Sequence, residues 1–81
     1  MASLTLYWHQ YVLDDQALPD ELFGLLMDRV YASNGRILWD RAYNKDIIVS
    51  IYDDDPWQSI FNVQYSDYMV SSSPHEKTYT W

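Results

Sequence analysis

The chain has 81 residues, which is enough for one domain, and its twelve acidic and five basic side chains give a formal net charge of −7. This charge argues against direct binding of nucleic acid or of an anionic membrane surface, because both need positive charge. Cysteine is absent, which excludes disulfides and thiolate metal sites and leads us to expect a reducing compartment, the cytoplasm.

Residues 4–13, LTLYWHQYVL, predict the first strand. Both of its faces are rather apolar, as is typical of a central strand. One face carries Leu4, Leu6, Trp8 and Val12, and the other carries Tyr7, His9, Tyr11 and Leu13. The segment MASLTLYWHQ lacks basic residues and a continuous apolar run, so we expect neither a signal peptide nor an anchor. No stretch approaches the roughly 18 apolar residues of a membrane span.

An amphipathic helix is predicted from about Pro19 to Ser33. Proline suits the first helical turn, because the N–H that it lacks would have no partner there. Asp20 and Glu21 place negative charge where the helix dipole favours it. Gly24 either weakens the helix or marks the close approach of a neighbour. The apolar stripe consists of Leu22, Phe23, Leu26, Met27 and Val30.

Three further strands are predicted after the helix, at residues 36–43, 47–52 and 57–65. The second of these, IIVSIY, is the strongest strand signal in the chain because it is rich in β-branched residues. The third alternates Trp57, Phe61 and Tyr65, among others, against polar residues. Residues 71–76, SSSPHE, predict a turn or loop, and residues 77–81 predict a short edge strand or a frayed end.

This order of elements predicts a single α+β domain over residues 1–81. We expect an antiparallel sheet of 4–5 strands, because the connections after the helix are short. One amphipathic helix would cover one face of the sheet. The other face would stay open and carry Tyr, Trp, Gln, Asn and Asp side chains.

Three consecutive aspartates, Asp53, Asp54 and Asp55, follow the strongest predicted strand. A calcium loop of the EF-hand type needs carboxylates at alternate positions, then glycine and a distant glutamate, and none of this is present. An exposed turn also lacks the environment that raises the pKa of a catalytic carboxyl group. A polar turn explains one or two of the aspartates, and the remaining negative charge is a candidate contact for a basic partner.

Catalytic motifs are missing elsewhere. His9 lies in a predicted strand among aromatic residues, where packing is the simpler explanation, and His75 lies in a polar predicted loop. The chain has no G-x-S-x-G motif and, with two glycines, no phosphate-binding or dinucleotide-binding loop. We therefore predict a protein that is not an enzyme and that uses neither a cofactor nor a metal.

The predicted function is inhibition of a basic protein that handles nucleic acid, such as a nuclease, a restriction or CRISPR effector, or a repair enzyme. Phage anti-defence proteins and toxin-immunity proteins share this size and charge, and some mimic the charge of nucleic acid. Carboxylates would steer association, and Tyr and Trp would anchor it. The predicted partner-binding residues are Asp53, Asp54, Asp55, Asp14, Asp15, Tyr52 and Trp57. The alternative is an adaptor or homodimerising structural domain that uses a Tyr/Trp-rich sheet face.

Overall fold

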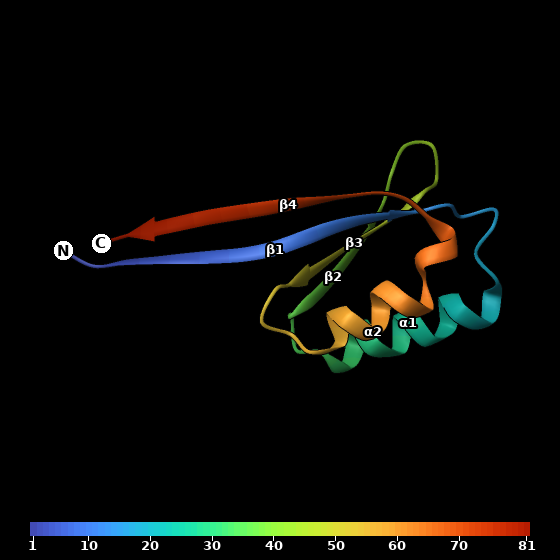
Figure 1. Ribbon diagram of the computed structural model, residues 1–81, viewed down its shortest axis with the longest axis horizontal. Helices are drawn as coiled ribbons and strands as arrows, with labels where there is room; N and C mark the ends of the chain where they lie inside the picture. The colour runs from blue at the N-terminus through green and yellow to red at the C-terminus, as the bar shows by residue number, and fades with distance from the viewer.

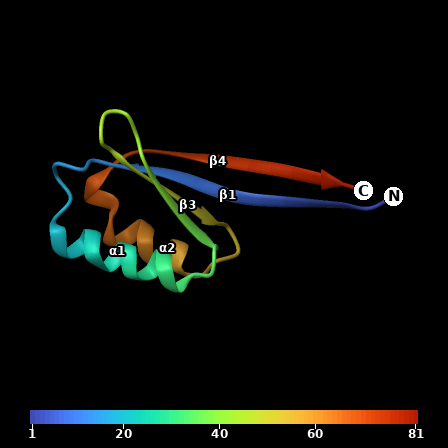
Figure 2. The ribbon, with the colours of Figure 1, turned by 180° about the vertical axis from the view of Figure 1, so that it is seen from behind.

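The computed structural model describes residues 1–81 as two layers, a four-stranded antiparallel sheet and two α-helices that cover one of its faces (Figures 1 and 2). The order of strands across the sheet is β2-β3-β1-β4. The strands are β1 (Ser3–Leu13), β2 (Ile37–Arg41), β3 (Ile47–Tyr52) and β4 (Met69–Thr80), and the helices are α1 (Asp20–Ala32), α2 (Trp57–Gln64) and the short 3₁₀ helix η1 (Ser66–Tyr68).

Four predicted elements are confirmed: strand β1, helix α1, and strands β2 and β3, which pair as an antiparallel hairpin. Helix α1 packs its predicted apolar stripe on the core, with Leu26 fully buried. Asn34 and Gly35 have positive φ angles of 55° and 85°, which ends the helical path after Ser33. A Cβ atom on Gly24 would meet nothing within 4 Å, so this glycine does not mark a close contact.

The strand predicted at residues 57–65 is wrong, because most of this segment forms helix α2. Trp57, Phe61 and Tyr65 are buried, and a spacing of four fits one face of a helix as well as it fits alternate positions of a strand. Val63, which the strand pattern places on the same face, is 80% exposed. This segment therefore adds no strand to the sheet, and it forms a second helix that covers the core beside α1.

The predicted loop at residues 71–76 is also wrong, because it belongs to the twelve-residue strand β4. Strand β4 pairs with β1 from Ser3↔Thr80 onwards, so β1 lies between β3 and β4, which confirms the predicted central strand. The backbone amides of Ala2 and Trp81 each donate to the other residue's carbonyl group. In this register the backbone of Pro74 points away from β1, so its missing N–H costs no hydrogen bond within the sheet.

The core fills the space between the sheet and the helices. Tyr65 is fully buried, and its hydroxyl group donates a hydrogen bond to the carbonyl oxygen of Leu22 at 2.7 Å, which ties the end of α2 to α1. No buried side-chain nitrogen or oxygen lacks a hydrogen-bond partner. The eleven buried residues are Tyr11, Leu13, Leu18, Leu26, Ile37, Ile47, Val49, Ile51, Trp57, Phe61 and Tyr65.

A two-stranded ribbon protrudes from this body. Strand β1 pairs with β3 only from Trp8 onwards, so residues 3–7 pair with residues 76–80 of β4 and with no further strand. We call this segment the ribbon. Both chain termini lie at its tip, and the molecule measures 47 × 25 × 19 Å (Figure 1). No helix in the structure has the length and apolar character needed to cross a membrane.

Candidate protein-binding surfaces

Asp53 is held by two neighbouring side chains. Its Oδ1 atom lies 2.7 Å from Nδ1 of His9 and accepts a hydrogen bond from Nε2 of Gln58 at 3.1 Å. These hydrogen bonds, that of His9 first, hold the pKa of Asp53 below its ordinary value of 3.8. The carboxylate thus joins β1 to the start of α2, and this contact is one reason for an acidic residue at this position.

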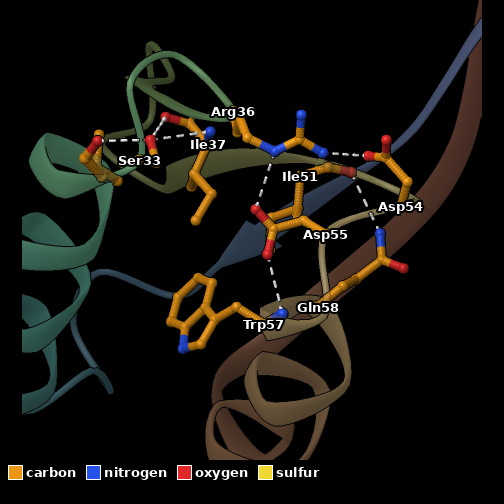
Figure 3. Close-up of polar contacts among 9 residues, drawn as sticks. Ser33, Arg36, Ile37, Ile51, Asp54, Asp55, Trp57 and Gln58 are labelled. Carbon is orange, nitrogen blue, oxygen red and sulfur yellow. Dashed lines mark hydrogen bonds and ion pairs between the residues drawn. The ribbon is translucent and has the colours of Figure 1, made fainter.

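Asp54 and Asp55 flank the guanidinium group of Arg36 (Figure 3). Arg36 Nη2 donates to Asp54, and Arg36 Nε lies 3.6 Å from Oδ2 of Asp55. Asp55 also accepts a hydrogen bond from the backbone N–H of Trp57 at 2.9 Å, which satisfies a free donor in the first turn of α2. Asp55 therefore has a structural role, whereas the Asp54 side chain remains 77% exposed.

Asp14 and Asp15 lie at the opposite end of the sheet from the three aspartates. They follow Leu13, which pairs with Ile47 at the start of β3, whereas Asp53 follows the far end of β3. Five residue steps along the strand separate these ends, a distance of about 17 Å. Asp15 forms an ion pair with Arg41 at 3.0 Å. The structure therefore does not bring Asp14 and Asp15 together with the three consecutive aspartates, although all five are predicted partner-binding residues.

The two predicted aromatic anchors differ in exposure. Tyr52 is half-buried, packs edge-on against Trp8 with a centroid distance of 6.4 Å, and lies under the guanidinium group of Arg36. Trp57 is 7% exposed and belongs to the core, where the guanidinium group of Arg29 stacks on its ring. Tyr52 is accessible to a partner, and Trp57 is not while α2 stays in place.

Five carboxylates lie on three segments that meet where β1 ends and α1 begins, and we call this group the acidic end. The backbone N–H of Asp14 donates to the carbonyl oxygen of Tyr68, which brings η1 beside this turn. Arg41 is the cation that pairs with the group, through Asp15. The members of the acidic end are Asp14, Asp15, Asp20, Glu21 and Asp67.

Of the acidic end, the sequence predicts Asp14 and Asp15 as partner-binding residues, and it explains Asp20 and Glu21 by the helix dipole alone. It misses Asp67, which joins the group only through the long-range contact between η1 and Asp14. No three His, Asp or Glu side chains lie together in a way that could hold a metal ion.

The sheet face opposite the helices is uncovered, and we call it the open face. Tyr11 and Leu13 of β1 point toward the helices, so the even-numbered residues of β1 point away from them. Trp8 stacks on His75 across the strand pair, with ring centroids 5.7 Å apart. A shallow hollow of about 160 Å³ lies on this face. Its lining residues are Leu6, Trp8, Arg36, Leu38, Ser50, Tyr52 and Tyr79.

The composition of the open face is more aliphatic than the sequence suggested. Leu4 and Leu38 are about half exposed there. Asp40 is on this face as expected, whereas Asn62 lies on α2 and donates to the hydroxyl group of Tyr11.

Comparisons of the chain with protein-family models, with curated proteins and with solved structures gave no match.

Proposed function

We propose that the protein is a non-catalytic inhibitor that binds a basic nucleic-acid-handling protein, such as a nuclease, a restriction or CRISPR effector, or a repair enzyme. The acidic end is the surface that meets this partner. The observation that carries the proposal is the lack of local neutralisation there: only Asp15 of its five carboxylates has an ion-pair partner. In contrast, Asp54 and Asp55 share Arg36, and Asp53 is hydrogen-bonded to His9 and Gln58.

The unpaired carboxylates give the interface its electrostatic character. Negative charge concentrated on one end of a small protein accelerates encounter with a basic surface, and it is screened as salt rises. A basic channel that binds nucleic acid presents Lys and Arg at the spacing of phosphates, so grouped carboxylates can occupy it in place of nucleic acid.

Exposed apolar side chains beside the acidic end complete the binding surface. Leu25 lies one helical turn after Glu21 and is 48% exposed, and Val63 lies near the start of η1. Such residues exclude water around the ion pairs, which charge alone does not achieve.

A charge-matched pair of variants tests the proposal. The immobilised protein is used to capture partners from lysate, each partner is identified by mass spectrometry, and its affinity is measured at several salt concentrations. The first variant combines Asp14→Asn, Asp20→Asn, Glu21→Gln and Asp67→Asn. The control removes four exposed charges elsewhere, with Asp28→Asn, Asp40→Asn, Asp54→Asn and Glu76→Gln.

We expect a captured basic protein whose nucleic-acid binding and activity the inhibitor suppresses. Duplex DNA should displace the inhibitor from it. The acidic-end variant should bind at least tenfold more weakly and with a smaller salt dependence, since it has lost several charge contacts, whereas the control should bind nearly as wild type does. Equal binding by both variants would refute the role of the acidic end, and a partner without nucleic-acid-binding activity would refute the proposed class.

A further inference from the structure

We propose that the open face is the interface of a homodimer in which two copies pack sheet against sheet, with their helices on the outside. The apolar side chains that point out of this face include Leu4, Leu38 and Tyr79, which are 51%, 54% and 46% exposed. Together with the half-buried Leu6, Trp8 and Tyr52, they form a surface across all four strands. A continuous apolar surface of this kind is typical of an interaction site.

Charge identifies the occupant as a second copy of this chain. The open face carries two cations, Arg36 and Lys77, and two anions, Asp40 and, at its edge, Asp54, whose carboxylate pairs with Arg36. These charges cancel, so the acidic excess of −7 lies on the rest of the molecule. Two acidic copies can meet through this face without like-charge repulsion, and their acidic surfaces then point away from each other.

The size of the face is close to that of a dimer interface. At about 3.4 Å per residue and 4.8 Å per strand, the long β1–β4 pair and the shorter β2–β3 pair project an area of roughly 550 Å². Because side chains project from the plane of the sheet, the solvent-accessible area of the face is larger than this projected area. The face therefore approaches the ~800 Å² that each partner contributes to a standard interface.

The ribbon also needs a cover. An isolated two-stranded ribbon has little stability in water. Leu4 and Leu6 continue the open face along it, and Tyr79 lies directly opposite Leu4. A second copy packed on the open face covers this apolar side. In a two-fold dimer, every contact of this face occurs twice.

Pairing of strand edges is a poorer route to a dimer. The outer edge of β4 contains Pro74, which has no N–H to donate, and Glu76, whose charge opposes a second acidic edge. We therefore infer packing through the face of the sheet.

A pair of exposure-matched substitutions tests this inference. Leu38→Lys changes a residue of the open face that is 54% exposed, and Ile60→Lys changes a residue of α2 that is 56% exposed. Both variants become less acidic by the same amount, so a difference between them reports on position. Sedimentation equilibrium is measured for the wild type and both variants at protein concentrations up to about 100 µM.

We expect the wild type and Ile60→Lys to dimerise. The dissociation constant of Leu38→Lys should rise on the order of a hundredfold, because a symmetric interface loses the side chain twice. Circular dichroism confirms that each variant is folded, and Leu4→Lys in the ribbon provides a second variant of the same face. A monomeric wild type would overturn the inference, as would equal dimerisation of all variants.

A monomeric wild type whose open face binds a different protein would also overturn the dimer. These outcomes do not affect the proposed inhibitor function, because none of the substituted residues belongs to the acidic end.

Discussion

Asp53, Asp54 and Asp55 have identical side chains and three different environments. Asp53 is bound by His9 and Gln58, Asp54 is mostly exposed beside Arg36, and Asp55 accepts the first N–H of α2. The repulsion among three adjacent carboxylates is thus reduced by contacts that point them in different directions. Sequence reasoning predicted that a turn needs one or two of these aspartates, and the contacts of Asp53 and Asp55 give the physical reason.

Asp53 makes the stability of the protein depend on pH. Its folded-state pKa lies below the ordinary value of 3.8, so ionised Asp53 stabilises the folded state above that pH. The contribution is lost as the pH falls through the lower, folded-state pKa. The free energy of unfolding of the wild type should therefore decrease more than that of Asp53→Asn between about pH 5 and pH 2.

Urea unfolding across this pH range measures the difference. Asp28→Asn is the control, because Asp28 is exposed and forms no side-chain hydrogen bond or ion pair. This control should follow the wild type. If Asp53→Asn follows the wild type as well, the contact with His9 does not contribute to stability.

At the scale of the secondary-structure elements, the sequence predicted α1, β1, β2 and β3, whose periodicity and end signals are local. It failed at α2 because Trp57, Phe61 and Tyr65 satisfy both a strand pattern and a helical pattern. The signal that distinguishes the two patterns is Asp55 followed by Pro56, an acidic residue and a proline at a helix start.

Strand β4 could not be predicted from its own residues. Its segment SSSPHE is polar and contains proline, which locally favours a turn. It becomes a strand because it pairs with β1, far away in the sequence: Glu76, for example, pairs with Tyr7. Asp67 joins the acidic end for the same reason, since its position depends on the η1 contact with Asp14.

The start of α2 provides a prediction at this scale. Asp55→Ala removes the hydrogen bond to the N–H of Trp57 and the ion pair with Arg36, so it should destabilise the fold by about 1 kcal/mol. Asp54→Ala removes an exposed ion pair and should change stability by less than about 0.5 kcal/mol. Urea unfolding followed by circular dichroism compares the two variants, and equal effects would contradict a specific role of Asp55 at the helix start.

At the scale of the whole molecule, the chain places its features on separate parts. The core occupies the body, the unpaired carboxylates occupy one end, and the apolar surface occupies the open face and the ribbon. The composition could predict an acidic surface and an uncovered sheet face. It could not predict that the open face carries no net negative charge, because this depends on which residues of each strand point toward the helices.

The ribbon should be the least stable part of the β1–β4 strand pair. All eleven buried residues lie between Tyr11 and Tyr65, so opening the ribbon exposes no core residue. In dilute protein, the hydrogen-bonded amides of Leu4 and Tyr79 should exchange with solvent through local opening, at an opening free energy of at most about 2 kcal/mol.

Amide exchange measured by NMR at two protein concentrations tests this expectation. The amides of Val49 and Ile51 in β3 are the internal reference, because they lie in the core and should exchange only when the whole fold opens. If two copies cover the open face, the protection of Leu4 and Tyr79 should rise with concentration, since association stabilises the closed ribbon by mass action. Ribbon amides as protected as those of β3 in dilute protein would instead show that the ribbon unfolds together with the body.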